Sequence, residues 1–409
     1  MNHKVAGKSL VGLVLICGLS EWPAAAQTFT VLHAFRNGSD DQQPLQGLVR
    51  GHHGNFYGTT GGPSFPPSPT NGGTVFRLNA DGALKTLVRF KGSNGANPGG
   101  GHLLRDEEEG NFYGLTGNGG TLPDGTAGRG TVYRVSPRGE LKEFYVFTGG
   151  ADGSGPGGTL LRDERGNLYG TTIQGGTAAS LGTVFKLDRE GHETVLHAFT
   201  GGGFGNPGSD GSAPIGGLVR DEDGNMFGVT TLGGVGYGTI FEITRSGEYK
   251  VVYSFKGAPD GTSPSGGLII DHDGNLYGTT LFGGFFDRGV VFKVDSGGTE
   301  TILHNFAGSF FFGDGAYPNS GVIRDEDGIM YGTTAGGSAD TTAFIGWGTV
   351  YKLDPTGTEV VLHSFPVNGP EGSPAGTLLR DDDGTLYGVT QEPITTGPPA
   401  FGTVYKIRP

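Results

Sequence analysis

Four short sequence elements recur together seven times along the chain, and this repetition limits the folds that it can adopt. One element is typified by NLYGTT and recurs every 50 to 58 residues. Its aromatic residue is Tyr57, Tyr113, Tyr169, Phe227, Tyr277, Tyr331 or Tyr387. The other three elements are typified by GGLVRD, GTVFKL and TVLHAF. Similar units in tandem indicate a repeat architecture, in which each unit buries apolar residues against its neighbours.

Each element is a short run of β-branched and aromatic residues bounded by Gly, Asp or Pro, which is typical of a β-strand. No window shows a helical period of apolar residues. Four strands in a unit of about 55 residues predict a propeller blade, because solenoid coils are shorter. The sequence therefore predicts an all-β fold: one seven-bladed β-propeller domain over residues 27–409, with four antiparallel strands per blade.

The two ends of the repeat array predict how the ring closes. The first repeated element is a TVLHAF strand ending at Phe35, and the last, GTVYKI, stands just before Pro409. The seven units are complete only if the N-terminal strand joins the last blade. Such closure leaves no open sheet edge.

Residues 1–26 have the features of a secretory signal peptide. Lys4 and Lys8 precede an apolar core that is too short to span a bilayer comfortably, and Ala24 and Ala26 supply a small-residue cleavage pattern. We expect a soluble protein exported to the periplasm or the cell exterior. Cys17, the single cysteine, lies in this leader, so we expect no disulfide in the mature chain.

The charge balance excludes some partners. The formal net charge is −13, and no basic run is present. A nucleic-acid partner and an anionic membrane surface are both disfavoured. We expect no membrane span in the mature chain, no cofactor and a monomer.

The linked pattern GNLYGTT…GG…GTVFKL…G…TVLHAF…DG…P…GGL resembles the GloVer tandem-repeat family of exported bacterial proteins. The resemblance covers essentially the whole mature chain. It implies an exported, propeller-like repeat protein and no particular reaction. Many members carry a C-terminal surface-anchoring signal, whereas this chain stops at its last strand, so we expect a soluble protein.

Loop lengths predict which face binds ligands. We name the strands a to d outward from the axis, with GGLVRD innermost because its Gly-rich start suits the crowded axis. The a–b and c–d turns are short and share one face. The b–c and d–a loops share the opposite face and hold the long insertions. Function tends to lie on variable loops held by a rigid scaffold, so we expect the binding site on this long-loop face.

The a–b sequence DEDG at residues 221–224 resembles a calcium loop, and related sequences start at Asp271, Asp325 and Asp381. An EF-hand needs a bidentate Glu at its twelfth position, which is missing here. A tight turn, with Asp capping the backbone, is the favoured interpretation. A weak Ca²⁺ site is the alternative.

Two further sets of repeated residues have both structural and functional interpretations. The Arg that ends strand a recurs at Arg105, Arg162, Arg220, Arg324 and Arg380. A ring of these Arg residues would bind anions, but pairing with an Asp on the same or the next blade is favoured. Outer-strand histidines stand at His33, His197, His304 and His363. Because these imidazoles are spread around the rim, they cannot meet at one metal, and we interpret them as packing residues.

The d–a loops carry an acidic or amide residue four positions before the loop Pro. The set is Asp40, Asn94, Asp152, Asp210, Asp260 and Asp314, with Glu371 breaking the pattern in the seventh repeat. These side chains are candidates for a ring at the channel mouth that holds a cation or hydrogen-bonds a sugar. The alternative is an Asp-Gly turn in every blade.

Residues that break the repeat are the remaining candidates. His102 stands where the other blades have Gly or Thr. The position before strand c varies on the long-loop face and holds Arg129, Tyr237, Arg288, Trp347 and Phe401. Imidazole, guanidinium and aromatic groups are parts of carbohydrate or anion sites. The alternative is neutral drift.

Three functions compete on these observations. A non-enzymatic binding propeller for glycans or proteins fits the near-symmetric blades and the absence of a nucleophile, metal or phosphate motif. An exported polysaccharide lyase or glycoside hydrolase would use His102 or an Arg with loop carboxylates. Such an enzyme needs a deep asymmetric pocket with two titratable groups about 5–10 Å apart. A structural envelope protein needs no pocket.

Overall fold

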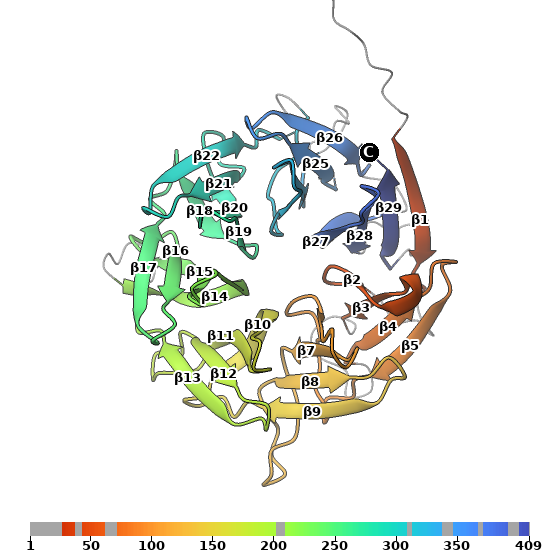
Figure 1. Ribbon diagram of the computed structural model, residues 1–409, viewed down its shortest axis with the longest axis vertical. Helices are drawn as coiled ribbons and strands as arrows, with labels where there is room; N and C mark the ends of the chain where they lie inside the picture. The colour runs from red at the N-terminus through yellow and green to blue at the C-terminus, as the bar shows by residue number, and fades with distance from the viewer. Residues whose placement is uncertain are drawn as a thin grey trace, which may run out of the picture.

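The computed structural model describes residues 27–36, 43–61, 72–201, 209–308, 313–337, 347–366, 371–391 and 401–408. Seven antiparallel β-sheets stand side by side in a ring around a central axis (Figure 1). In the described residues the only helical element is the 3-10 turn η1 (His52–Gly54), and no helix there is long and apolar enough to cross a bilayer. The predicted seven-bladed propeller is confirmed.

We number the blades in chain order, and each runs from strand a at the axis to strand d at the rim. Blade 1 holds β2 (Val49–Arg50), β3 (Phe56–Thr60), β4 (Thr74–Leu78) and β5 (Leu84–Arg89). Blade 2 holds β6 (Leu104–Arg105), β7 (Phe112–Thr116), β8 (Thr131–Val135) and β9 (Leu141–Val146). Blade 3 holds β10 (Ser154–Arg162), β11 (Leu168–Gln174), β12 (Thr183–Leu187) and β13 (Glu193–Ala198).

The remaining blades repeat this order. Blade 4 holds β14 (Ser209–Arg220), β15 (Met226–Gly234), β16 (Thr239–Ile243) and β17 (Tyr249–Ser254). In blade 5 strand a is split into β18 (Gly261–Pro264) and β19 (Ile269–Ile270), followed by β20 (Leu276–Gly283), β21 (Val290–Val294) and β22 (Glu300–Asn305). Blade 6 holds β23 (Ile323–Arg324), β24 (Met330–Thr334), β25 (Thr349–Leu353) and β26 (Glu359–Ser364). Blade 7 holds β27 (Ser373–Arg380), β28 (Leu386–Gln391), β29 (Thr403–Arg408) and β1 (Thr28–Ala34).

The ring closes in blade 7 as the sequence predicts. The N-terminal strand β1 pairs antiparallel with β29, in a register that runs from Thr28 opposite Arg408 to Ala34 opposite Thr403. In Figure 1 the red β1 lies at the rim beside the dark blue β29. The two ends of the described chain therefore belong to one sheet, and no sheet edge stays open between them.

The TT and GTV sequences are explained by contacts between strands b and c. The hydroxyl groups of Thr172 and Thr183 lie 2.8 Å apart in the interior, and the Thr183 amide donates to the Thr172 hydroxyl at 3.1 Å. Val290 replaces the second Thr in blade 5. The other hydroxyl pairs are Thr60–Thr74, Thr116–Thr131, Thr230–Thr239, Thr334–Thr349 and Thr390–Thr403. These pairs satisfy polar groups that the apolar core would otherwise leave unpaired.

The strand-b glycine is required because an aromatic ring of strand c lies over it. A methyl group on Gly170 would come within 2.7 Å of the Phe185 ring. The apolar core then continues from blade to blade: Phe199 of blade 3 packs with Leu218 and Phe241 of blade 4. Each such buried side chain contributes on the order of 2 kcal/mol through removal from water.

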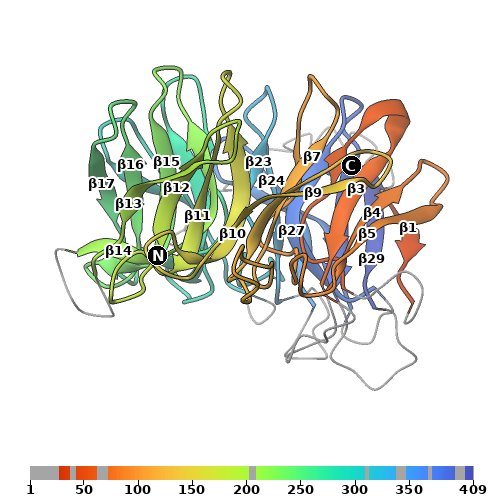
Figure 2. The same cartoon turned by 90° about the horizontal axis from the view of Figure 1, so that it is seen from below.

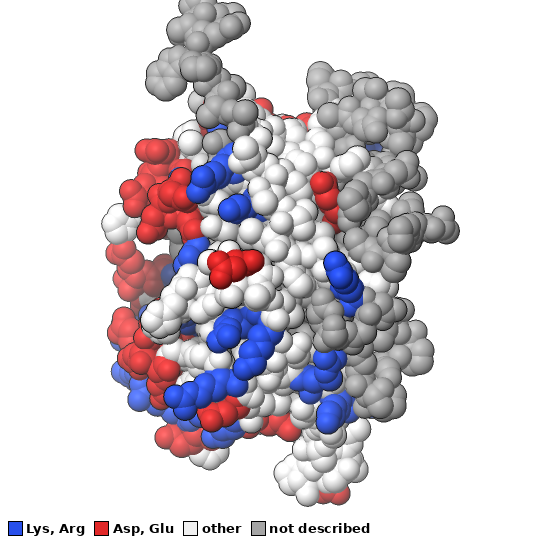
Figure 3. All heavy atoms as spheres, turned by 90° about the vertical axis from the view of Figure 1, so that its right-hand side faces the viewer, with Lys and Arg blue, Asp and Glu red and all other residues white. Residues whose placement is uncertain are grey.

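The a–b and c–d turns lie on one face of the ring, and the described parts of the b–c and d–a loops lie on the opposite face (Figure 2). The DEDG sequence forms a tight turn, in which the Asp221 carboxylate accepts the Asn225 amide at 2.8 Å and Gly224 adopts a φ of +91°. The turn interpretation is therefore confirmed. Exposed acidic side chains gather on the face of the ring that carries these turns, which is on the left in Figure 3. In blades 2 and 7 the exposed acidic residues of the turns are Glu107, Glu108, Glu109, Asp382 and Asp383.

Most of the repeated Arg residues pair with acidic residues, as the structural interpretation expects, and four of them join neighbouring blades. Arg162 of blade 3 lies 3.6 Å from Asp106 of blade 2, and Arg220 of blade 4 lies 3.9 Å from Glu164 of blade 3. Around the ring, each such pair links the end of one strand a to the a–b turn of the preceding blade. The further interblade pairs are Arg380–Asp325 and Arg50–Asp381.

Replacing Tyr351 with Phe is expected to stabilise the propeller by roughly 1 kcal/mol, because its buried hydroxyl has no hydrogen-bond partner. Burial raises the pKa of this phenol, so it stays neutral. Four blades already carry Phe at this position. Tyr331 is the matched control: its hydroxyl donates to Asp325 at 3.0 Å, so Tyr331→Phe should cost roughly 1 kcal/mol. Urea unfolding of both variants measures the difference, and a loss of stability in Tyr351→Phe would contradict the assignment.

Candidate functional site

An axial cavity of about 690 Å³ lies among the inner strands of all seven blades. Residues from the d–a loops and from the starts of the b–c loops line it, Asn97 and Asn118 among them, which places it toward the long-loop face. Around it, neighbouring strands a approach so closely that some positions have no room for a side chain. A methyl group on Gly158 would overlap the carbonyl oxygen of Gly216 in the next blade. This confirms that the GGLVRD strand is innermost.

Among the sequence-predicted site residues that the structure describes, only His102 lines this cavity. Its Nδ1 lies 3.0 Å from the hydroxyl oxygen of Thr159 on the neighbouring blade. Protein surrounds the ring, although part of its surface faces the cavity. Burial lowers the pKa of this imidazole to about 4. The ring is therefore neutral at physiological pH, and presents no charge to a ligand.

The rest of the described cavity wall is uncharged. Among the described lining residues, His102 is the only titratable side chain. Gln46 donates to the Gly99 carbonyl at 2.8 Å, and Ser265 donates to the Pro318 carbonyl at 2.9 Å. The remaining wall is largely glycine backbone with small apolar and hydroxyl side chains. Such a wall offers hydrogen-bonding groups and apolar surface but no pair of acid–base groups.

The other repeat-breaking residues lie away from the cavity. The backbone amides of Arg129 and Trp347 donate to the carbonyl groups of Phe147 and Phe365, each just beyond an outer strand. Arg129 and Arg288 are exposed, and Tyr237 is half-buried. Trp347 and Phe401 are buried in the core. The structure does not bring any of them next to His102.

Arg288 belongs to an exposed aromatic group in blade 5 whose other members have no counterpart in the sequence predictions. The Arg288 guanidinium lies over the Tyr317 ring at 5.1 Å, and the Phe282 ring meets Tyr317 at 5.6 Å. Phe285 nearby is 77% exposed. The run LFGGFFDRG is the sequence signal for it, because its three Phe residues break the usual loop composition.

The d–a carboxylates face the outer strand, which supports the loop-turn interpretation over a ring at the channel mouth. Asp152 accepts hydrogen bonds from the Tyr145 hydroxyl at 3.1 Å and the Thr148 amide at 2.7 Å. Asp260 likewise accepts hydrogen bonds from the Tyr253 hydroxyl and the Lys256 amide. Asp210 contacts His197 and accepts from the Thr200 amide. Asp314 contacts His304 and accepts from the Ala307 amide. Each caps its own loop and fixes its own outer strand. Asp40 lies outside the described residues.

The outer-strand His or Tyr and the loop carboxylate therefore form one unit. Blade 1 supports this, because its outer strand has Val88 at the His/Tyr position and its loop has the uncharged Asn94. Asn94 accepts the Lys91 amide at 2.7 Å, so the loop cap survives without the carboxylate. In blade 6 the pair is His363 with Glu371, 3.3 Å apart.

A third residue, at the start of the next blade's outer strand, completes what we call a junction cluster. At three junctions it is a glutamate whose Oε1 is buried without a hydrogen bond: Glu193, Glu300 and Glu359. The pKa of each glutamate is raised to about 7, mainly by burial. The neighbouring loop carboxylate raises it further: Asp152 for Glu193, Asp260 for Glu300 and Asp314 for Glu359. At two other junctions an aromatic ring takes this place and stacks on the His: Tyr249 on His197, at 3.8 Å, and Phe29 on His363, at 3.9 Å. The packing interpretation of the outer histidines holds there.

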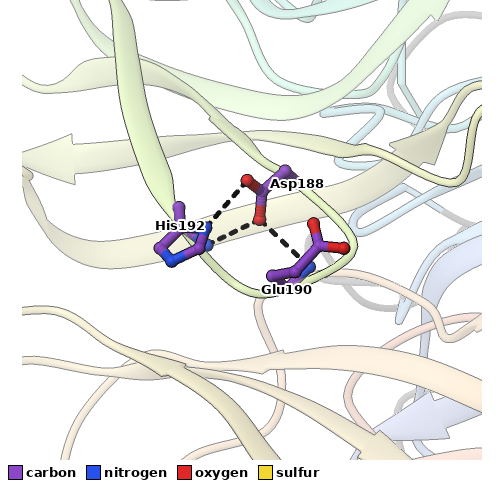
Figure 4. Close-up of side chains that lie close together, drawn as sticks. All are labelled: Asp188, Glu190 and His192. Atoms are coloured by element: carbon purple, nitrogen blue, oxygen red, sulfur yellow. Dashed lines mark hydrogen bonds and ion pairs between the residues drawn. The ribbon is translucent and has the colours of Figure 1, made fainter.

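Two groups in the described residues bring three potential metal ligands within 4.8 Å of one another. One is Asp188, Glu190 and His192 in the c–d turn of blade 3 (Figure 4). Its Asp188 carboxylate already accepts the Glu190 and His192 amides at 3.0 and 2.8 Å. The equivalent Asp295 and Asp354 cap their turns in the same way. This first group is therefore a turn cap at the surface. The other group is His304, Asp314 and Glu359.

Comparison with known proteins identifies the repeat. The sequence profile of the Gloeobacter/Verrucomicrobia repeat matches residues 19–210 and 203–345, which is most of the chain. The chain belongs to this family. No curated protein sequence matches this Gloeobacter/Verrucomicrobia repeat protein.

Solved structures resemble the repeat protein in fold. A candidate 6-phosphogluconolactonase from Bacteroides uniformis aligns with a TM-score of 0.51 and 17% identity, over 83% of this chain and 90% of that one. A gluconolactonase from Xanthomonas campestris aligns with a TM-score of 0.41 and 14% identity, over 74% and 82%. A candidate gluconolactonase, covering 94% and 92%, has a TM-score of 0.42 and 12% identity. At this identity, the Bacteroides uniformis structure supports the fold alone.

Proposed function

We propose that this repeat protein is an exported binding module that takes an uncharged glycan segment into its axial cavity from the long-loop face. The observation that carries the proposal is the uncharged character of the described cavity wall, in which the single titratable side chain is a neutral imidazole. An anionic or cationic ligand would find no opposite charge in the described wall. A neutral sugar would find hydroxyl, amide and backbone groups beside apolar surface.

The size and position of the cavity support this function. About 690 Å³ is within the usual range for small-ligand sites, roughly 300–1,000 Å³. Much of the wall is glycine backbone of the innermost strands, which is in close contact with the neighbouring blades. A rigid site of this kind loses little entropy on binding.

The enzyme alternative, an exported polysaccharide lyase or glycoside hydrolase, finds less support in the described residues. Glycoside hydrolysis uses two carboxyl groups on either side of the scissile bond. His102 is the only titratable side chain in the described cavity wall, and the loop carboxylates on which that alternative relied are bonded to outer strands. An axial cavity also disfavours the purely structural role, which needs no pocket.

A panel of neutral and acidic polysaccharides tests the proposal with residues 27–409. We expect binding to at least one neutral polysaccharide without release of reducing ends, with or without chelator. The variant Gly267→Thr should weaken this binding at least tenfold, because Thr at the equivalent positions 159 and 377 lines the cavity and the added side chain narrows it. Isothermal titration calorimetry with a soluble oligosaccharide measures the affinity.

Phe285→Ala is the matched control, because Phe285 is exposed on the long-loop face outside the described cavity wall. We expect its affinity to equal that of the wild type. Product release would support the enzyme alternative, and failure to bind any glycan would favour the structural role. Loss of binding in Phe285→Ala with retention in Gly267→Thr would move the ligand to the loop surface and contradict the cavity site.

A further inference from the structure

One junction cluster has three side chains of metal-ligating type. His304 lies in β22 of blade 5, Asp314 lies in the loop that leaves that blade, and Glu359 is the first residue of β26 in blade 6. Their ligand atoms lie within 4.8 Å of one another. The His304 Nε2 and an Asp314 oxygen are 3.4 Å apart.

Two atoms of this cluster have no hydrogen-bond partner although they are fully buried. They are the Nε2 of His304 and the Oε1 of Glu359. A buried polar atom without a partner costs on the order of 1–3 kcal/mol, and buried polar groups in native proteins are nearly always paired. Both atoms belong to the same three-residue cluster. A shared partner between them would remove both costs.

Comparison with the other junctions shows what is special about this one. The clusters of Asp152 and Asp260 have the same Asp and Glu but carry a Tyr in place of His304: Tyr145 and Tyr253. There the Tyr hydroxyl donates to the Asp at about 3 Å. His304 makes no such hydrogen bond. His197 and His363 each stack on an aromatic ring, that of Tyr249 or Phe29. At the equivalent position beside His304 the side chain is Glu359. Among the described junctions, that of blades 5 and 6 alone combines His, Asp and Glu.

We propose that His304, Asp314 and Glu359 bind a divalent first-row metal ion of the zinc type at the junction of blades 5 and 6. Zinc takes one imidazole and two carboxylates with bond lengths near 2.0–2.2 Å, which places tetrahedral ligands roughly 3.4 Å apart. The spacing of His304 and Asp314 already matches that value. A small rotation of the Glu359 side chain brings the third ligand in, and water takes the fourth position.

Charge and support around the cluster fit this ion. Two carboxylates and a neutral imidazole balance a doubly charged cation, so the loaded cluster carries no net charge in a partly buried place. The Ala307 amide donates to the Asp314 carboxylate at 3.0 Å and orients it. The His304 side chain is 16% exposed, so the cluster lies close to solvent at the rim although its ligand atoms are buried.

The position of the site indicates what the ion does. His304 and Asp314 belong to blade 5 and its outgoing loop, whereas Glu359 belongs to blade 6. The ion therefore joins two blades at the rim. Because the ion binds the folded chain and not the unfolded chain, the free energy of unfolding rises with the logarithm of the metal concentration.

Zinc titration of the chelator-treated mature protein tests the site. We expect one Zn²⁺ per chain by calorimetry, a Co²⁺ derivative with a visible absorption band, and a rise in unfolding temperature with Zn²⁺. His304→Tyr should weaken binding at least tenfold and remove the stabilisation. This variant should fold, because it copies the clusters of Tyr145 and Tyr253. Glu359→Gln, which is nearly isosteric, should also weaken binding at least tenfold.

Two further variants make the assignment specific. His192→Ala removes the exposed group in the blade 3 turn and should leave zinc binding unchanged. Tyr253→His supplies the missing imidazole at the junction of blades 4 and 5, and should raise the stoichiometry to two. No zinc binding by the wild type, full binding by both His304→Tyr and Glu359→Gln, or loss of binding in His192→Ala would each overturn the proposal. None of these readouts depends on glycan binding.

Discussion

Replacing Gly158 with Ala is expected to destabilise the propeller by roughly 3 kcal/mol or more. Gly158 has a φ of +79°, where a side chain costs roughly 1–2 kcal/mol. In addition, its methyl group would overlap the Gly216 carbonyl in the next blade. Overpacking of this kind typically costs another 1–3 kcal/mol. The atoms that the methyl group would meet belong to the backbone, which cannot move aside as a side chain can.

Urea unfolding measures this effect, with Gly267→Ala as the matched control. Gly267 lies on the inner strand of blade 5, outside the positive-φ region, and its added methyl group would meet no atom closer than the Gly217 nitrogen at 3.5 Å. We expect its stability to change by less than about 1 kcal/mol. Equal costs in the two variants would show that the inner strands are not in the close contact described.

The fold could be predicted from the sequence because the same physical requirement recurs in every blade. The strand-b Gly, the strand-c aromatic and the Thr pair each satisfy a local contact, such as Gly170 under Phe185. Seven repetitions make such a pattern visible without knowledge of the contact. The closing of the ring followed from the order of the elements, which needs no side-chain geometry.

The candidate site could be predicted only in part. His102 was visible because it breaks the repeat, and the structure places it in the axial cavity. The cavity itself is made largely of glycine backbone, which leaves no distinctive residues in the sequence. The position before strand c also varies from blade to blade, but its residues lie toward the outer strands. Variation alone therefore does not distinguish residues of a binding site from residues at the rim.

The junction clusters were hidden for a different reason. From the sequence alone, Asp314 is a candidate for the channel mouth or for a loop turn, and His304 is interpreted as a packing residue. Their contact depends on the direction in which the d–a loop folds back. The contact with Glu359 crosses between blades. The sequence signal that links the two positions lies in blade 1, which has Val88 and Asn94 there. It is the one described blade that lacks both the aromatic or imidazole ring and the carboxylate.

Replacing His102 with Thr is expected to make the propeller less sensitive to acid. Burial lowers the pKa of His102 from 6.5 to about 4, so below pH 6.5 the unfolded chain takes up a proton that the folded chain does not. The wild type therefore loses stability as the pH falls from 6.5 toward 4. At pH 5 the full shift corresponds to about 2 kcal/mol. We expect roughly 1 to 2 kcal/mol because part of the ring faces the cavity.

The measurement is the difference in unfolding free energy between His102→Thr and the wild type at pH 7.5 and at pH 5. This difference should move in favour of the variant by roughly 1 to 2 kcal/mol on acidification. Comparison with the wild type removes the opposing effect of Glu193, Glu300 and Glu359, whose raised pKa values stabilise the folded chain as the pH falls from 7. His53→Asn, at an exposed position with a φ of +60° that Asn tolerates, is the control and should show no such change. If the difference between His102→Thr and the wild type is independent of pH, His102 is open to solvent and charged in acid, and the cavity wall is not the neutral surface on which glycan binding is proposed.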